Sequence, residues 1–370
     1  MRIVLFYQSL ISDWNHGNAH FLRGVASELV AAGHDVGIYE PYDSWSLQNL
    51  LAENGPQPLF EFYRAYPQLS GHRYELDQLK LEEVLECAEL VIVHEWNEPA
   101  LIGRIGEYRR RHGDFLLLFH DTHHRVAAFD SLPFDLRDYD GVLAYGQVLT
   151  DRYLSNGWTT RAWTWHEAAD VRVFRPLPKI TRSLDVVWVG NWGDEERTAE
   201  LQEFLVQPVR DLKLNAEVYG VRYPHEAVET LKRAGIRYCG WLPNYKVPEV
   251  FARSRVTLHI PRRPYVRDLP GIPTIRPFEA MACGIPLICS PWHDTEHLFT
   301  PGSDFLIAHD GEEMKQLLKK VLSEPERAEE LALNGLATIR QRHTCAHRVD
   351  ELMKIYGEFA TERQHAMAAI

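Results

Sequence analysis

The stretch TIRPFEAMACGIPLICS (274–290) contains the local signals of a helix followed by a buried strand. Phe278 and Met281 recur at the spacing of one apolar helix face, and Gly284 is a residue of the type that ends a helix. PLICS (286–290) is a short apolar run typical of a strand buried on both faces. A helix that leads directly into such a strand is the repeating unit of a parallel α/β sheet.

The same alternation of short apolar runs and amphipathic stretches extends along the whole chain. Helical spacing lies between the runs, for example in AHFLRGVASELVAAG (19–33). The strands expected are 2–8, 34–40, 90–96, 115–121 and 141–146 in the first half, and 184–192, 216–221, 236–241, 256–261, 286–291 and 305–310 in the second. This order predicts the α/β class, with two facing Rossmann-like domains that each contain a parallel sheet.

The expected domain boundaries follow from a break in this pattern. FRPLPKITRS (174–183) has two prolines, several polar residues and no periodicity, which is typical of a linker. We therefore expect an N-terminal domain at 1–172, a C-terminal domain at 173–346 and a final helix at 347–370.

Composition narrows the class of protein. The net charge of −12 argues against a protein that binds nucleic acid by neutralising phosphates. The five cysteines form no CxxC pair, which favours reduced thiols over disulfides or zinc. We expect a cytoplasmic protein without a transmembrane segment, because no apolar stretch approaches about 20 residues. Peripheral contact with a membrane stays open.

Ligands of parallel sheets bind outside the carboxyl ends of the strands, and this rule selects a catalytic group in the first half. His120 and Asp121 lie in HDTHHR (120–125), where His120 can move a proton while Asp121 orients or accepts. Glu95 follows another strand and can deprotonate a hydroxyl. No metal is predicted, because no fourth ligand is evident. A solvated loop at 120–125 is the alternative.

Gly17 and Asn18 stand just ahead of the first helix. Their backbone N–H groups can bind a phosphate or a sugar hydroxyl there. The alternative is that Asn18 caps the helix as an ordinary turn residue.

In the second half, the carboxyl ends select a cationic region. Arg197, in GNWGDEER (190–197), can clamp a diphosphate together with backbone N–H groups, or be an ordinary exposed arginine. RRPYVRDLPGIPTIR (262–276) has four arginines in a loop rich in proline and glycine that can fold around an anion. Glu279, beside the apolar helix face, can accept two hydrogen bonds from a ribose diol.

Three stretches resemble retaining GT-B glycosyltransferases of the large family 4 type, closest to the spore-maturation-protein-like branch. RPFEAMACGIPLICS (276–290) resembles the family's FEAMACGxPVI segment. WHEAADVRVFRP (165–176) resembles the interdomain segment NGVDxxxFxP, and GNAHFLRGVASELVAAGHDV (17–36) resembles the glycine loop followed by LAxxLxxxGHxV. The final helix resembles the helix that crosses back to the first domain in this fold.

The resemblance implies a hexosyltransferase of glycan or glycoconjugate biosynthesis. It would move a sugar from a nucleoside-diphosphate sugar, with a UDP-sugar favoured, to an unidentified acceptor hydroxyl, with retention and without a metal or other cofactor. Glu279 would bind the ribose, and His120 would lie beside the transferred sugar. The residues expected to bind the donor are Gly17, Asn18, Gly190, Asn191, Arg197, Trp241, Leu242, Arg267, Thr274, Ile275, Arg276 and Glu279.

The sequence departs from the family at one position. Family members commonly have two glutamates separated by seven residues, of which Glu279 matches the second, whereas the first would fall at Gly271. Two alternatives therefore stay open. One is a nucleotide-sugar epimerase of the same fold, which would use His120, Asp121 and Glu95 around the sugar. The other is a nucleotide-sugar binding module that has lost catalysis.

Overall fold

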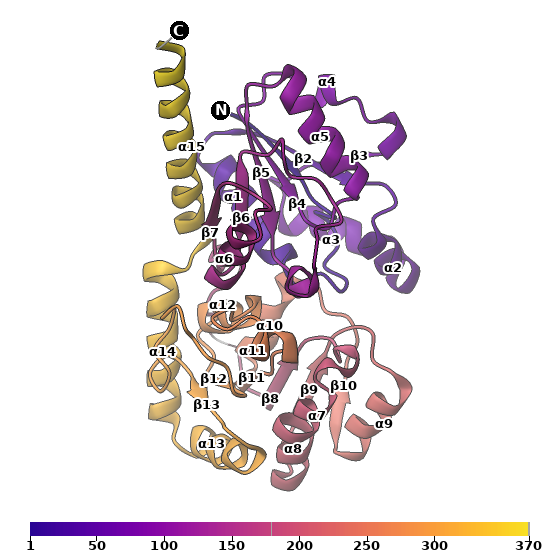
Figure 1. The fold of residues 1–370 in the computed structure, drawn as a ribbon. Coiled ribbons are helices and arrows are strands. Elements are labelled where there is room, and N and C mark those ends of the chain that lie inside the picture. Colours follow the sequence, from indigo (N-terminus) through magenta and orange to yellow (C-terminus); the bar gives the residue numbers. More distant parts are fainter. Residues whose placement is uncertain (179, 369–370) are drawn as a thin grey trace. The chain divides into compact units, whose positions relative to one another are not determined.

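The computed structural model describes residues 1–178 and 180–368 (Figure 1). The chain divides into two compact units: unit 1 comprises Met1–Glu167 and Cys345–Ile370, and unit 2 comprises Ala168–Thr344. The boundaries expected from the sequence, after residues 172 and 346, lie a few residues beyond these divisions.

Unit 1 contains a sheet of seven strands in the order β3-β2-β1-β4-β5-β6-β7, and each neighbouring pair is parallel. Its strands are β1 (Arg2–Phe6), β2 (Asp35–Pro41), β3 (Gly71–Tyr74), β4 (Leu90–His94), β5 (Leu116–Asp121), β6 (Gly141–Ala144) and β7 (Ala162–Thr164). Its helices are α1 (Ala19–Ala31), α2 (Trp45–Asn54), α3 (Gln57–Ala65), α4 (Leu81–Val84), α5 (Pro99–His112), α6 (Gln147–Ser155) and α15 (Cys345–Ala368), with 3-10 turns at Leu76–Gln78 and His124–Ala128.

The sequence did not predict two of these strands, β3 and β7, which are the edge strands of the sheet. β3 reads GHRY and β7 reads AWT, so neither has the apolar run of a strand buried on both faces. Each pairs with a single neighbour, and β3 is held in part by the stacking of His72 on Tyr39 of β2, with ring centroids 5.1 Å apart. These strands form through pairing with the sheet rather than through a local pattern.

Unit 2 contains a sheet of six strands in the order β10-β9-β8-β11-β12-β13, again with parallel neighbours. Its strands are β8 (Leu184–Val189), β9 (Ala216–Tyr219), β10 (Ile236–Tyr238), β11 (Ser254–His259), β12 (Leu287–Cys289) and β13 (Leu306–Ile307). Its helices are α7 (Thr198–Leu201), α8 (Gln207–Leu212), α9 (His225–Arg233), α10 (Val247–Ala252), α11 (Arg263–Arg267), α12 (Ile275–Ala282), α13 (Gly311–Ser323) and α14 (Pro325–Arg342). A π-helical turn at Gln202–Val206 connects α7 to α8, and Asn244–Lys246 and Asp194–Glu196 are 3-10 turns.

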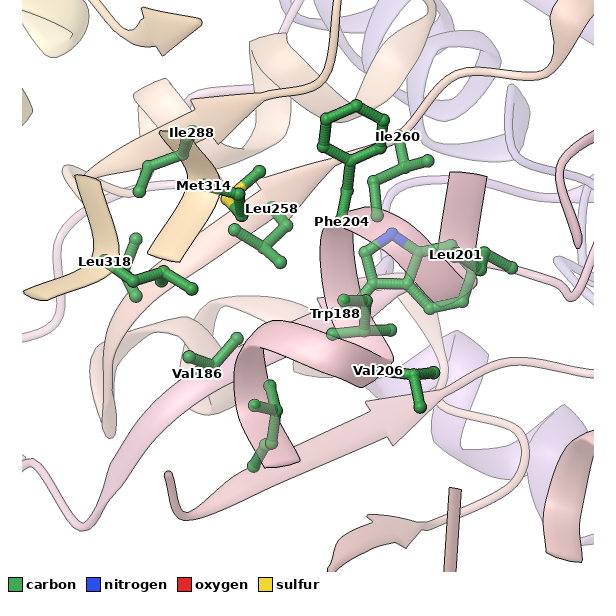
Figure 2. Packing of buried hydrophobic residues seen from close by; sticks show 14 of the residues in the cluster. Val186, Trp188, Leu201, Phe204, Val206, Leu258, Ile260, Ile288, Met314 and Leu318 are labelled. Carbon is green, nitrogen blue, oxygen red and sulfur yellow. The ribbon is translucent and has the colours of Figure 1, made fainter. Parts of the chain in front are cut away.

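The core of unit 2 lies between its sheet and the helices that cover it (Figure 2). Val186 and Trp188 of β8 and Leu258 of β11 are buried in the same cluster as Met314 and Leu318 of α13. Burying a side chain of this size stabilises a fold by about 1.5–3 kcal/mol. The apolar runs identified in the sequence therefore form the sheet interior, which confirms the predicted α/β class.

The final helix belongs to unit 1, as the sequence predicts. Figure 1 shows α15 in yellow alongside α1. Near its start the indole Nε1 of Trp165 donates a hydrogen bond of 2.8 Å to the carbonyl of Arg348, and further along Arg161 pairs with Glu362 at 2.7 Å. The segment after residue 344 thus returns to the domain in which the chain began.

Two further observations concern the cysteines and the possibility of a membrane-spanning helix. The five cysteines are free thiols, as expected from their spacing. None of the helices in the described residues combines the length and the apolar character that crossing a membrane requires.

Helical glycines provide a test of this packing. A Cβ at Gly335 of α14 would lie 2.8 Å from Cγ of Met281 and 2.9 Å from the carbonyl oxygen of Asp304, whereas a Cβ at Gly357 of α15 would meet nothing within 4 Å. We predict that Gly335→Ala lowers the free energy of unfolding by about 1–3 kcal/mol through overpacking. The matched Gly357→Ala should raise it by up to about 1 kcal/mol. Thermal and urea unfolding measure both; equal effects would contradict the close approach of α12 and α14.

Candidate functional sites at the two sheet edges

In each sheet the order of the strands reverses once, and the loops beside that point are where parallel sheets bind ligands. In unit 1 the reversal lies between β1 and β4, and in unit 2 between β8 and β11. The carboxyl ends of these strands gather most of the predicted site residues within each unit. Each edge is described by itself below.

The edge of unit 1 contains the three predicted catalytic residues, all of them buried. His120 and Asp121 end β5, and Glu95 follows β4 directly. Consecutive residues of a strand point to opposite faces, and the side-chain contacts of His120 and Asp121 differ accordingly. Asp121 accepts from the hydroxyl of Tyr153 at 2.9 Å and from the backbone N–H of His123 at 3.1 Å. Asp121 is thus bound to α6 and to its own loop.

Glu95 is held by an arginine and a threonine. Its Oε2 accepts from Arg125 at 2.9 Å, and its Oε1 accepts from the N–H and the hydroxyl of Thr122 at 3.3 Å. The guanidinium of Arg125 lies 3.8 Å from the ring centroid of Trp96. Burial, reinforced by the nearby charge of Asp121, raises the pKa of Glu95 to about 8, and Arg125 only partly opposes this. Burial also raises the pKa of Asp121. Near neutral pH the protonated form of Glu95 is therefore favoured.

His120 is a neutral imidazole in an aromatic pocket. It lies 4.9 Å from Trp165 and 5.9 Å from Phe21, measured between ring centroids, and burial lowers its pKa to about 3. His94, beside it in the sheet, bonds through Nε2 to the hydroxyl of Thr122 at 3.0 Å. Both rings can exchange hydrogen bonds with a ligand, but neither is an acid at neutral pH.

The sequence did not single out His16, although it lies in a loop that the carboxyl-end rule selects. His16 follows β1 and is 4% exposed, with its ring centroid 6.0 Å from that of His94. Its place after a strand was the available signal, but a single histidine ahead of Gly17 has no pattern that separates it from a turn residue.

Gly17 and Asn18 precede α1 as expected, and Asn18 does not cap that helix with its side chain. Its Nδ2 donates instead to the carbonyl and the hydroxyl of Thr122, at 3.0 and 2.6 Å. Asn18 thus joins the loop after β1 to the loop after β5. Gly17 is exposed beside it, which leaves its N–H on the surface of the unit.

The edge of unit 2 is held together by Arg197. This half-buried guanidinium donates to the carbonyls of Ile260, at 3.0 Å, and Asn191, so it connects the loop after β8 to the loop after β11. Burial lowers its pKa to about 9. The sequence left two roles open for Arg197, binding a diphosphate or being an ordinary exposed arginine. In the structure Arg197 links two loops through hydrogen bonds to their carbonyl groups.

Gly190 and Asn191 lie in the same loop, in close contact with the next one. A Cβ at Gly220 would lie 2.1 Å from the carbonyl oxygen of Gly190, so only glycine fits there. Asn191 accepts a hydrogen bond of 3.0 Å from the N–H of Val221.

Glu279 is fully buried in α12, where it forms an ion pair with Arg276. Asn244 donates to its other oxygen at 3.4 Å, and Asn244 directly follows the loop that contains the half-buried Trp241 and Leu242. Asn244 therefore links the segment that contains the predicted residues Trp241 and Leu242 to Glu279, which is distant in the sequence.

The residues that begin α12 are unusual. Thr274 has φ of 60°, a left-handed conformation that costs a β-branched residue roughly 1–3 kcal/mol. Its hydroxyl lies 3.3 Å from Nε2 of His259, the buried last residue of β11, whose pKa burial lowers to about 3. Nδ1 of His259 is buried without a hydrogen-bond partner in the described part of the chain. Ile275 and Arg276 follow in the first turn, where backbone N–H groups favour an anion.

The arginine-rich loop differs from the expectation. Arg262 pairs with Glu196 at 2.7 Å, and Arg263 pairs with Glu200 at 2.8 Å. Since Arg276 is paired with Glu279, Arg267 is the member of the group that is exposed and has no ion pair among the residues described. Most of the positive charge of the arginines in 262–276 is thus already neutralised by acidic side chains of unit 2.

Gly271 has a structural reason to be glycine. Its φ is +92°, and a Cβ there would lie 2.6 Å from Oγ1 of Thr295 and 2.9 Å from Oε1 of Glu296. A glutamate at this position would be strained and would collide, so the family's first glutamate has no room in this loop.

Metal binding was not predicted, and in residues 1–178 and 180–368 no three His, Cys, Asp or Glu side chains are arranged to hold a metal ion.

One sequence-family model matches part of the chain. Residues 197–354 match a family model described as glycosyl transferase-like. No curated protein is similar enough in sequence to be recognised as a relative.

Solved structures match over almost the whole chain. Sucrose-phosphate synthase from Thermosynechococcus elongatus is 15% identical, with a TM-score of 0.65 over 98% of this chain and 100% of that chain. HepE from Anabaena, in complex with UDP and glucose, is 14% identical, with a TM-score of 0.65 over 96% and 99% of the two chains. A DNA-modifying β-glucosyltransferase, also studied with uridine diphosphoglucose, is 14% identical, with a TM-score of 0.63 over 96% and 99%. The chain therefore has the GT-B fold.

The raised pKa of Glu95 gives a prediction for stability against pH. A carboxyl whose pKa is higher in the folded than in the unfolded state stabilises the fold at low pH and loses that contribution as pH rises towards 8. The histidines, whose pKa values are lowered, contribute a change only below about pH 6.5. We predict that the melting temperature of unit 1 falls as pH rises from about 6.5 to 8, by about 2–4 °C per kcal/mol lost, and levels off above that range.

Glu95→Gln should flatten this slope, because the amide does not titrate. The matched change Glu107→Gln, at an exposed position of α5, should leave the slope as in the wild type. A slope that survives in Glu95→Gln would contradict the assignment. Differential scanning calorimetry at fixed ionic strength measures all three proteins.

Proposed function

We propose that the protein is a glycosyltransferase that moves a hexose from a nucleoside-diphosphate sugar to an acceptor hydroxyl. Unit 2 binds the nucleotide, and unit 1 presents the acceptor. The observation that supports this most directly is the buried carboxylate of Glu279, bound to Arg276 and Asn244 at the carboxyl edge of unit 2. The match of residues 197–354 to a glycosyl transferase-like family covers that edge.

The donor-binding role follows from the chemistry of this edge. A carboxylate accepts two hydrogen bonds from the vicinal hydroxyls of a ribose, which a buried and ion-paired position holds in place. The N-terminal turn of α12, with Thr274, Ile275 and Arg276, offers backbone N–H groups to a diphosphate. Arg267 adds an exposed positive charge. Trp241 and Leu242 supply apolar surface for a base, next to Asn244.

A UDP-sugar is the favoured donor, because similar folds have been solved with UDP and glucose and with uridine diphosphoglucose. The leaving diphosphate is stabilised by Arg267 and by the backbone N–H groups at the N-terminus of α12, so the reaction needs no metal and no other cofactor. We propose a retaining outcome. The enzyme would act in the cytoplasm, with peripheral membrane contact where its acceptor requires it.

The overall activity is tested with a panel of UDP-, GDP- and dTDP-sugars and candidate acceptors, with and without EDTA. Nucleotide release that depends on acceptor and persists in EDTA is the expected result, and the anomeric configuration of the product by NMR tests retention. Conversion of the sugar to its epimer without acceptor would contradict the proposal. Tight binding of nucleotide sugar without turnover across the acceptor panel would identify an inactive binding module instead.

Glu279→Gln tests the ribose site. Losing a hydrogen bond to a charged group costs about 1.5–3 kcal/mol, so we predict that UDP binds about 10- to 100-fold more weakly in titration calorimetry. Since Glu279 is buried with Arg276, this variant should also melt lower than the wild type.

The exposed Glu330→Gln of α14 is the control and should bind UDP like the wild type. Normal UDP affinity in Glu279→Gln would show that the ribose lies elsewhere.

His120→Ala tests the role of unit 1. We predict that kcat falls by about 100-fold, while the KM for the donor changes by less than about 3-fold, because His120 acts at the transferred sugar and not at the nucleotide. His120→Asn, which retains a polar group, separates this effect from loss of packing against Trp165. An equal loss in kcat and in donor affinity would contradict the assignment.

A further inference from the structure

Three histidine rings form a row at the carboxyl edge of unit 1. His16 and His94 are 6.0 Å apart between ring centroids, and His94 and His120 are 5.4 Å apart. They come from the loop after β1 and from the ends of β4 and β5; β1 and β4 flank the reversal point of the sheet, and β5 is the next neighbour of β4. His16 has no role in the proposed function above.

The row contains one satisfied histidine between two that are not. His94 bonds to Thr122. Neither ring nitrogen of His16 makes a hydrogen bond of good geometry within the described residues, although the Ser12 backbone lies close enough to the ring to act on it, and Nε2 of His120 has no partner there. His16 is only 4% exposed and His120 only 1%. Buried polar atoms are normally paired, so these three nitrogens indicate a place where a ligand supplies the missing partners.

Both unsatisfied rings are neutral. Burial, followed by the charge of Arg23, lowers the pKa of His16 to about 4, and the backbone of Ser12 only partly offsets this. A neutral imidazole has one N–H donor and one nitrogen lone pair. A hydroxyl both donates and accepts, so it satisfies either nitrogen, whereas an anionic oxygen only accepts and would face the lone pair unfavourably.

The charges around the row also favour an uncharged ligand. Arg23, which acts on His16, is fully buried and paired with Asp13 at 2.9 Å. Arg125, which acts on His94, is paired with Glu95 at 2.9 Å. Arg23 is therefore already neutralised by a carboxylate and Arg125 is already bound to the carboxyl group of Glu95, so neither guanidinium is free to bind an anion.

The position of His16 also differs from that of a histidine that only packs in a hydrophobic core. It stands directly before the exposed Gly17, at the N-terminus of α1, where Asn18 has turned its side chain away to Thr122. The neighbouring His94 does have a partner, the hydroxyl of Thr122, so this edge can satisfy an imidazole that has only a structural role.

We propose that His16, together with His120, forms a subsite for the hydroxyl groups of a neutral sugar or polyol, and that this is the acceptor of the transfer reaction. The two nitrogens of His16 would bind a hydroxyl as donor and as acceptor. This assignment to the acceptor rests on the proposed function, whereas the preference for a neutral polyol rests on the edge of unit 1 alone.

The experiment measures binding by saturation-transfer NMR and by titration. The probes are neutral methyl glycosides of glucose, galactose, mannose and N-acetylglucosamine, the charged methyl glucuronide, and UDP. The full chain is compared with His16→Ala, His16→Asn and His16→Gln. The two amide variants place a donor and an acceptor near the positions of Nδ1 and Nε2. His112→Ala, exposed at the end of α5, is the matched control.

We expect at least one neutral glycoside to bind the wild type and to bind about 10-fold more weakly to His16→Ala, with partial recovery in Asn or Gln. UDP affinity, melting temperature and the His112→Ala control should stay unchanged. Failure of every neutral glycoside to bind, a preference for the glucuronide, or equal glycoside affinity in His16→Ala would each overturn the inference.

These outcomes are distinct from failure of the proposed function. A wild type that binds neutral glycosides through His16 but binds no nucleotide or nucleotide sugar would refute the glycosyltransferase and retain the polyol subsite. If the wild type transfers sugar and His16→Ala has the same KM for the acceptor, the glycosyltransferase would be retained and the polyol subsite refuted.

Discussion

The parallel direction of every strand pair is the constraint on which both sites depend. When strands run the same way, all their carboxyl ends meet at one edge, and the chain must cross back between strands, in most cases through a helix. Loops that are distant in the sequence therefore meet beside one another. His16, His94 and His120 meet in this way in unit 1, and Asn244 and Glu279 do so in unit 2.

Polar loops gathered in this way need internal partners to hold their shape. Arg23, fully buried, donates to Asp13 and to the carbonyls of Leu10 and Ile11, which fixes the loop after β1. Arg197 does the same for two loops of unit 2. Removing a charge from water is costly, so these arginines contribute less to stability than to a single loop conformation. A site that is held rigid before its ligand arrives loses less free energy on binding.

The two edges differ in charge, and this difference fits the division of labour that we propose. The edge of unit 1 has neutral imidazoles and a carboxyl, Glu95, that burial inclines towards its protonated form. The edge of unit 2 has Arg267 exposed and the N-terminus of α12 nearby. The first suits hydroxyl groups and the second suits a diphosphate, although the net charge of the chain, −12, indicates neither.

The sequence by itself determined most of the order of strands and helices, the two sheets, the strand ends at which Glu95 and His120 lie and the helix that contains Glu279, because periodicity and helix signals are local properties. It missed the edge strands β3 and β7, which form only by pairing with a neighbour. Only the tertiary structure decided which polar groups are available to a ligand. Arg262 and Arg263 are neutralised by Glu196 and Glu200, far away in the sequence, because partners across loops depend on how the chain folds. Within the described residues, the ring nitrogens of His16 are left without a hydrogen bond of good geometry for the same reason.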